Sequence, residues 1–266
     1  MNSIINAVKE HKPLIHCITN PISINQCANA ILAVGGTPIM AEHPEEVGEI
    51  TDSASALVLN LGNITDIRIE SMLVSALRAK EKNIPIVVDL VGIACSRLRR
   101  NFAHRLVQNS TPAVIKGNYS EINALYNCGY FSSGVDADKT LDVHNTGKIA
   151  ARLAQKYNCI ILASGATDIV TDGKQLLYIT NGTPQLSAVT GTGCMLGALC
   201  GCYMSVCSDI RGAVTACVVL GACGELAATD KGNGTFMVNL MDNLSVVTDK
   251  DIEKYMKAEE KNIESV

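Results

Sequence analysis

Short runs of apolar residues alternate along the chain with longer segments in which apolar and polar positions repeat with a helical period. The short runs are five to seven residues long and rich in Ile and Val, which is typical of strands buried on both faces. They are LIHCI (14–18), ALVLNL (56–61), IPIVVDL (84–90), PAVIK (112–116) and CIILA (159–163). This pattern predicts five strands of a parallel sheet.

Two of the longer segments carry apolar residues at positions i, i+3, i+4 and i+7, as amphipathic helices do. Residues 64–83 follow this pattern. Residues 140–158 follow it too, with Thr140 or Asp142 as the N-cap and basic residues before Asn158. Because strands and helices alternate, we predict an α/β fold with a mostly parallel central sheet and helices on both faces.

The pattern changes in the second half of the chain. Residues 168–182 (DIVTDGKQLLYITNG) predict a hairpin that turns at Asp172 and Gly173. Residues 194–228 predict two consecutive helices rich in small residues, and residues 249–262 predict an amphipathic surface helix. No linker or repeat interrupts the chain, so the sequence predicts a single domain.

Composition and charge narrow the choice of partners. The domain comprises residues 1–266 and is 47% hydrophobic, which suffices for a large core. A net charge of −4 without a basic stripe makes nucleic acids and membrane surfaces poor partners. The 11 cysteines lack framework spacing and no secretory leader is evident, so we expect a cytoplasmic protein. Residues 175–208 carry no charge, but polar residues interrupt them, which favours a buried helix pair over a membrane span.

Polar residues follow all five predicted strands. In open parallel sheets ligands bind beyond the carboxyl ends of the strands, so these positions indicate a binding site. They are Asn20 in TNP (19–21), NLGN (60–63), Asp89, Lys116 with Asn118, and Ser164 with Gly165.

The segment SAVTGTGCMLGALCGC (187–202) opens with a glycine turn before a long apolar run. Its third glycine, Gly197, stands one position too late for the dinucleotide-binding fingerprint, and no P-loop is present. Gly191 and Gly193 form either a cradle for an anion at a helix N-terminus or a tight turn for helix packing. In the first case Cys194 lies in the first helical turn, where the positive end of the helix stabilises a thiolate.

Three other groups of residues have competing interpretations. Cys200, Cys202 and Cys207 are better explained as small buried residues than as metal ligands, because helix residues two apart face different sides. His16 and Cys17 are strand neighbours on opposite faces and cannot form a dyad. Glu121 is either part of a capping box or, with Asp89, a ligand of Mg²⁺ through water.

These motifs give the chain a resemblance to the hydroxyethylthiazole kinase family of the ribokinase-like superfamily. The resemblance runs nearly end to end. It is carried by residues 13–47, IPIVVDLVG (84–92), VIKGNYSEI (114–122), GATDIVTDG (165–173) and above all VTGTGCMLGA (189–198). It implies ATP-dependent phosphorylation of the alcohol of 4-methyl-5-(2-hydroxyethyl)thiazole in thiamine salvage, with Mg²⁺, in a homotrimer whose active sites lie between subunits.

The resemblance also implies a role for individual residues. Cys194 stands where most ribokinase-like kinases have an aspartate base, in an anion hole formed with Gly191 and Gly193. Met40, Asn20 and Gly191 correspond to the thiazole site. The remaining positions correspond to the ATP site, at Lys116, Ser164 and Asn118, and to the metal site, at Asp89 and Glu121.

Three departures from the family pattern bear on these roles. The family usually has DPVG after the third strand, and this chain has DLVG (89–92). The following IACSRLRR (93–100) lacks the usual Gly-Ala-Thr, which leaves the position of this loop open. Lys116 replaces a more common Arg, which keeps the charge but loses the planar fork for phosphate. Two alternatives remain open: a kinase of another heterocyclic alcohol, and a non-catalytic thiazole- or nucleotide-binding protein.

Overall fold

The computed structural model describes residues 4–132 and 141–261. They form one nine-stranded sheet in the order β2-β1-β3-β4-β5-β6-β7-β8-β9. The first six strands in chain order pair in parallel, and β7, β8 and β9 add antiparallel strands at one side. The strands are β1 Leu14–Ile18, β2 Thr37–Ile39, β3 Ala56–Asn60, β4 Ile86–Asp89, β5 Val114–Asn118, β6 Ile160–Ser164, β7 Asp168–Thr171, β8 Leu176–Ile179 and β9 Ala258–Lys261. The predicted α/β class and the five parallel strands are confirmed.

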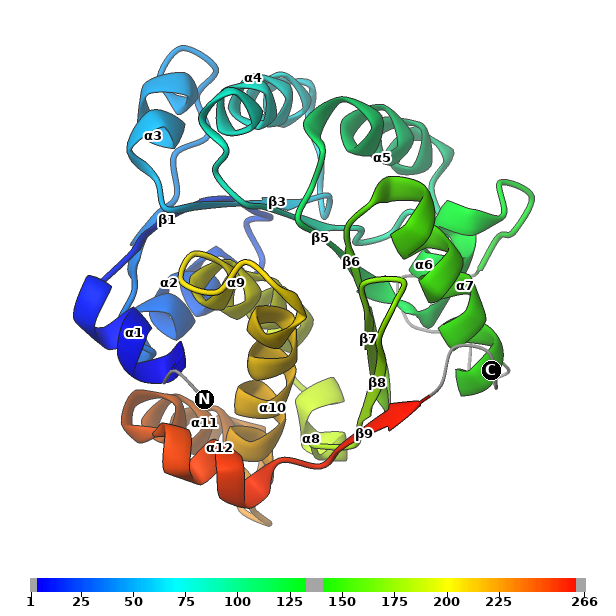
Figure 1. The fold of residues 1–266 in the computed structure, drawn as a ribbon. Coiled ribbons are helices and arrows are strands. Elements are labelled where there is room, and N and C mark those ends of the chain that lie inside the picture. The colour runs from blue at the N-terminus through cyan, green and yellow to red at the C-terminus, as the bar shows by residue number, and fades with distance from the viewer. Residues whose placement is uncertain (1–3, 133–140, 262–266) are drawn as a thin grey trace.

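Helices cover both faces of this sheet (Figure 1). Helices α3 to α7 lie on the convex outer face, and α1, α2 and α8 to α12 fill the concave inner face. The first group is α3 Val47–Ser53, α4 Asp66–Lys82, α5 Arg97–Ser110, α6 Tyr119–Tyr126 and α7 Val143–Tyr157. The second is α1 Ile4–His11, α2 Ile24–Ala33, α8 Pro184–Ser187, α9 Thr192–Met204, α10 Ile210–Ala227, α11 Asn233–Val246 and α12 Asp249–Tyr255.

Two apolar clusters separate along these faces. One joins the sheet to α4, α5, α6 and α7, and the other joins it to α2, α9, α10 and α11. Helix α9 packs closely on β3 because it has a glycine at the crossing: a Cβ on Gly201 would lie 2.5 Å from the Cγ2 of Val58. The small residues in α9 and α10, the two helices predicted over 194–228, therefore allow close packing.

The capping residues explain where the outer helices begin and end. Thr65 caps α4, and Asn83 ends it in the left-handed conformation. Asp142 caps α7, and Asn158 ends it in the same way. The alternative cap, Thr140, lies outside the described residues.

The expected helix over 249–262 is wrong beyond its first half. Helix α12 ends at Tyr255, and residues 258–261 form β9, which pairs antiparallel with β8. The edge of β8 offers unpaired backbone groups with which another strand can pair. Asn181, just after β8, holds the residue before β9 in place, because its Oδ1 accepts from the Lys257 N–H at 2.8 Å. Backbone pairing thus overrides the helical pattern; residue 262 lies outside the described part.

Among the described residues, one helix is long and apolar enough to cross a membrane by length and composition, namely α10 (Ile210–Ala227). The fold buries 78% of it. Its neighbours are α9 and α11, and its apolar residues belong to the inner cluster. The two consecutive helices predicted over 194–228 are confirmed as α9 and α10 and are buried, whereas the uncharged segment 175–208, expected to hold a buried helix pair, contains β8, the short α8 and only one long helix, α9.

Candidate active site

A cavity of about 770 Å³ lies beyond the carboxyl ends of the central strands. Seven of the ten residues to which the resemblance gives a role line it, and the long turn before α9 forms another wall. The seven are Lys116, Asn118, Glu121, Ser164, Gly191, Gly193 and Cys194. The fold therefore brings together residues from the fourth and fifth predicted strands and from the glycine turn.

The N-terminus of α9 faces this cavity. Gly191 is its N-cap, with a φ of 97° that an L-residue rarely adopts, and no side chain of the described residues caps the helix. The first intrahelical bond runs from the Met195 N–H to the Gly191 carbonyl, so the N–H groups of residues 192–194 precede the helical ladder. Uncapped N–H groups and the helix dipole make this end of the cavity suited to an anion.

Lys116 is buried at the floor of the cavity. Its Nζ donates to both carboxylate oxygens of Asp89, at 3.0 and 3.1 Å, and to the Gly193 carbonyl at 2.8 Å. Burial has the largest single effect and lowers the pKa of the ammonium, but the nearby acidic groups, Asp89 first among them, together raise it more, so the net direction is upward. Lys116 is thus a fixed positive charge that ties β5 to the first turn of α9.

Asp89 itself does not line the cavity. Its side chain is fully buried beneath Lys116, and Asn60 Nδ2 donates to its Oδ2 at 2.9 Å. The register explains this grouping, because Asn60, Asp89 and Lys116 are direct neighbours on the adjacent strands β3, β4 and β5. Side chains at matching positions of parallel strands point to the same face.

Glu121 lines the cavity and also completes a capping box. Its Oε2 accepts from the Asn118 N–H and its Oε1 from the Gly92 N–H, both at 2.7 Å, while Asn118 Oδ1 accepts from the Glu121 N–H. Burial, with a smaller contribution from the charge of Asp89, raises the pKa of the Glu121 carboxyl to about 7. A buried carboxylate at a cavity wall fits a hard cation held through water.

The raised pKa of Glu121 makes stability depend on pH. Between the ordinary pKa of 4.5 and the folded pKa of about 7, the folded protein holds this proton more tightly than the unfolded chain. Its contribution to stability is therefore full below pH 4.5 and is lost as the pH rises to 7. Calorimetry should show that Glu121→Gln removes a downward slope of about 1.4 kcal/mol per pH unit from the wild-type stability between pH 5 and 7. Equal slopes for the two proteins would contradict this assignment.

Cys194 lies half-buried in the first turn of α9 and lines the cavity. Two amides donate to its sulfur: Asn20 Nδ2 and Asn60 Nδ2, each at 3.3 Å. Asn20 is buried and does not line the cavity, so the structure places it behind the thiol.

Met40 and Ser164 take different positions. Ser164 lines the cavity, and its hydroxyl donates to the Gly117 carbonyl at 3.4 Å. Met40 follows β2, is half-buried against the inner cluster and does not line the cavity of the single chain.

The departures at 89–100 lie at the end of β4, in the connecting loop 90–96 and in the first turn of α5. The Leu90 N–H donates to the Lys116 carbonyl at 2.8 Å, a bond that proline could not make at this position. The Arg100 guanidinium holds the following segment by donating to the carbonyls of Ile93, Ala94 and Cys128. The loop that the sequence left open is fixed by an arginine from the next helix.

Two functional candidates were missed in the sequence. Asp168 lines the cavity, where burial raises the pKa of its carboxyl to about 6, and its Oδ1 accepts from the Gly165 N–H at 3.0 Å. Asn60 was noted only as part of the polar segment after its strand. In the sequence, Asp168 begins the predicted hairpin three residues after Gly165. This closeness to a selected strand end is the signal that could have pointed to it.

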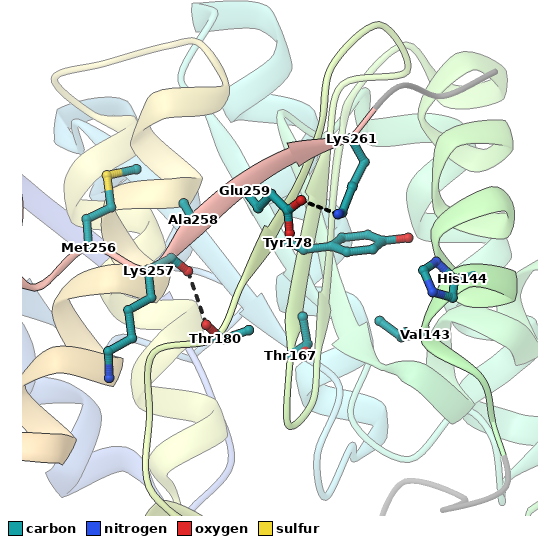
Figure 2. A pocket seen from close by; sticks show the side chains of 10 residues that line it. All are labelled: Val143, His144, Thr167, Tyr178, Thr180, Met256, Lys257, Ala258, Glu259 and Lys261. Atoms are coloured by element: carbon teal, nitrogen blue, oxygen red, sulfur yellow. Dashed lines mark hydrogen bonds and ion pairs between the residues drawn. The ribbon is translucent and has the colours of Figure 1, made fainter. Parts of the chain in front are cut away.

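A second, smaller cavity of about 390 Å³ lies at the outer strands (Figure 2). Tyr178 lies between Lys261 and His144, and Lys257 extends away from it. Lys257 pairs with Glu225 at 2.7 Å and Lys261 pairs with Glu259, so both lysines are already compensated. The larger cavity is therefore the candidate active site.

Burial and hydrogen-bond partners decide between the remaining interpretations of the cysteines and of His16. No group of three or more potential metal-ligating His, Cys, Asp or Glu side chains occurs within residues 4–132 and 141–261. Cys200 and Cys202 are buried, as expected. Cys207 is a correction to that expectation: it follows the end of α9, is only half-buried, and its Sγ donates to Asp209 Oδ1 at 3.4 Å. His16 contacts Thr51 Oγ1 and the Ala41 carbonyl and has no contact with the Cys17 sulfur among the described interactions.

Comparison with known proteins decides the family. A family model described as “Hydroxyethylthiazole kinase family” matches residues 5–250. The chain belongs to the hydroxyethylthiazole kinase family. A hydroxyethylthiazole kinase 2 of Clostridium botulinum (strain 657 / Type Ba4) is 44% identical over 258 residues, which cover 94% of this chain and 97% of the relative. Members of this family are phosphotransferases, so the protein is an enzyme.

Solved structures agree with this assignment. The structure of hydroxyethylthiazole kinase protein from Pyrococcus horikoshii OT3 superposes with a TM-score of 0.89 at 32% identity, over 97% of this chain and 98% of that one. A pyridoxal kinase from Staphylococcus aureus in complex with ADP shares the fold, with a TM-score of 0.66 at 13% identity over 94% and 98% of the two chains. This hydroxyethylthiazole kinase family member therefore has the ribokinase-like fold expected from the sequence.

Proposed function

We propose that this protein transfers the γ-phosphoryl group of ATP to the hydroxyl of 4-methyl-5-(2-hydroxyethyl)thiazole, which salvages the thiazole for thiamine synthesis. The observation that carries this proposal is the uncapped N-terminus of α9, which faces a cavity lined by Lys116 and Cys194. Phosphoryl transfer needs mainly positioning and neutralisation of charge, and this arrangement supplies both.

Each wall of the cavity has a role in this proposal. The N–H groups of residues 192–194 receive the transferred phosphoryl group, and Gly191 adjoins the thiazole. Lys116, Asn118 and Ser164 bind ATP, whose phosphates meet the fixed charge of Lys116. Asn118 and Ser164 support this role because they are register partners on β5 and β6 and both line the cavity.

Mg²⁺ is the proposed cofactor. Glu121 fits a Mg²⁺ ion held through water, because it lines the cavity and a cation there would relieve the burial of its charge. Asp89 was expected to share this role, but its pairing with Lys116 keeps it off the cavity wall. When bound, Mg²⁺ neutralises charge on the phosphate oxygens.

Cys194 is the proposed general base for the alcohol. The variant Cys194→Asp should retain or raise activity, because its carboxylate also accepts from the two amides and from the helix N-terminus. Base assistance contributes about 10²- to 10⁴-fold, so Cys194→Ser should remain measurably active. Steady-state kinetics will test this pair, and a folded but inactive Cys194→Asp would contradict the assignment.

The activity itself is tested by ADP release with Mg²⁺ and ATP, with and without hydroxyethylthiazole. Release that depends on the thiazole is the expected result. Release with pyrimidine or pyridoxal-like alcohols but not with the thiazole would indicate a kinase of another heterocyclic alcohol. Thiazole binding without turnover would indicate a binding protein.

We also propose a cytoplasmic homotrimer with active sites between subunits, in which Met40 contacts the thiazole. Exposed apolar residues on and before α2 support an interface: Ile22 and Leu32 are each 57% exposed. A Cβ on Gly191 would lie 3.3 Å from the Ser23 Cβ, so this surface adjoins the glycine turn. Light scattering at several protein concentrations will give the oligomeric state.

A further inference from the structure

Two asparagines from different strands converge on the Cys194 sulfur. Asn60 is the last residue of β3, and Asn20 follows β1 by two residues. Their Nδ2 atoms each lie 3.3 Å from Cys194 Sγ, and the Asn20 Nδ2 also donates to the Asn60 Oδ1 at 3.1 Å. Both side chains are buried, at 5% exposure for Asn20 and 1% for Asn60.

The hydrogen-bond pattern fixes the orientation of the Asn60 amide. Its Oδ1 accepts from the Gly62 N–H at 2.9 Å, and its Nδ2 donates to the Asp89 carboxylate at 2.9 Å. The N–H group can only donate and the carboxylate can only accept, so a flipped amide would lose both bonds. Asn60 thus uses two acceptor and two donor positions, and its second donor faces the Cys194 sulfur.

The Asn20 amide is fixed in the same way. Its Oδ1 accepts from the backbone N–H groups of Ile22 and Ser23, each at 3.2 Å. Its two N–H bonds therefore serve Asn60 Oδ1 and Cys194 Sγ. The sulfur faces two donors that cannot turn away.

The number of lone pairs on sulfur gives this arrangement a chemical consequence. A thiol has two lone pairs, and the two amides occupy both. A thiolate has three, so one acceptor position remains, and Cys194 lines the cavity in which the alcohol is proposed to bind. The amide pair therefore favours a sulfur that accepts the proton of the substrate hydroxyl.

Asn60 has a further connection that Asn20 lacks. It bonds Asp89, which pairs with Lys116, and Lys116 donates to the Gly193 carbonyl next to Cys194. The hydrogen bonds form a ring that begins and ends at the first turn of α9. Asn60 holds the sulfur within this ring.

We propose that Asn60 is a positioning residue for phosphoryl transfer that acts through Cys194; this inference rests on the proposed kinase function. In the step it supports, the substrate O–H bond breaks as its proton passes to sulfur, and the oxygen forms a bond to the γ-phosphorus. The bond from that phosphorus to the ADP oxygen breaks with its electron pair remaining on ADP. The proton on sulfur is then released to solvent.

A double-mutant cycle tests whether Asn60 acts through the thiol. In the wild-type background, Asn60→Ala should lower kcat about 10- to 100-fold, since hydrogen bonds to charged groups have this strength, and should leave the KM for ATP unchanged. In the Cys194→Ala background, the same change should lower kcat less than about twofold, because the partner is gone. Equal losses in both backgrounds would overturn the proposal.

Alkylation supplies a readout that does not require kinase activity. Peptide mapping after iodoacetamide treatment should show slower labelling of Cys194 in Asn60→Ala, with unchanged labelling of the exposed Cys128. Asn239→Ala is the matched control, because Asn239 donates to the Ala227 carbonyl and lies off the cavity wall. It should change neither rate.

The outcomes separate this inference from the proposed function. If Asn60→Ala does not fold by thermal unfolding, the milder Asn60→Ser takes its place in both experiments. Slower Cys194 labelling without thiazole-dependent turnover would retain the contact and reject the kinase. Thiazole-dependent turnover with unchanged Cys194 labelling and additive losses of kcat would reject the role of Asn60 alone.

Discussion

Gly193→Val should abolish nearly all kinase activity while leaving the protein folded. A Cβ on Gly193 would lie 3.7 Å from Lys116 Nζ, which is an ordinary contact, so the backbone tolerates a side chain. The two methyl groups of valine would extend beyond the Cβ position at the cavity wall. In our proposal, the helix N–H groups receive the phosphoryl group there. Removing one such donor typically costs about 10²- to 10³-fold in rate, and valine would obstruct more than one.

Gly201→Ala in the same helix is the matched control. Its added Cβ would lie 2.5 Å from Val58, so this variant should lose stability. The fraction of the protein that stays folded should keep its kinase activity, because Gly201 is far along α9 from the glycine turn. Thermal unfolding and ADP release measured on both variants will separate the two effects. Normal turnover by Gly193→Val would show that the phosphoryl group does not use this end of the cavity.

Lys116→Met should destabilise the fold strongly as well as abolish activity. The substitution leaves the Asp89 carboxylate with no exposure and without its cation, and within residues 4–132 and 141–261 only Asn60 still donates to it. Breaking a buried ion pair by removing one partner costs about 3–5 kcal/mol. Urea unfolding at neutral pH should therefore show a loss of this size.

The double variant Lys116→Met with Asp89→Asn should recover much of the stability but none of the activity, since it removes the uncompensated charge and still lacks the cation. The cost of Lys116→Met should also shrink as the pH is lowered, because burial raises the pKa of Asp89 and the variant loses the Lys116 charge that lowers it, so the carboxyl is neutralised more readily. A stability loss below about 1 kcal/mol for the single variant would show that Asp89 does not need the Lys116 charge to stay buried.

Local patterns determined most of the architecture. Apolar runs rich in β-branched residues predicted the parallel strands, and helical periodicity with capping residues predicted α4 and α7. The hairpin was predicted from Asp172 and Gly173, which stand between β7 and β8 in the structure. Each of these features depends on residues close together in sequence, which is why a single sequence sufficed.

The candidate site was predictable only in part. Residues after strand ends were expected to meet, because parallel strands present their carboxyl ends at one edge, and those after the fourth and fifth predicted strands do line one cavity, namely Lys116, Asn118, Ser164 and Gly165. Asp89 and Asn20 were selected by the same rule but lie behind the cavity wall. Their depth depends on which neighbours cover them, and strand order alone does not specify this.

The sequence by itself determined the fold class, the glycine turn and, through its motifs, the family. Only the tertiary structure decided that Asp89 pairs with Lys116, that Asn20 and Asn60 hold Cys194, and that residues 258–261 join the sheet as β9. Helix and strand patterns arise from neighbours along the chain. These pairings join residues up to 174 positions apart, so they depend on strand register and on the close packing of α9 against the sheet.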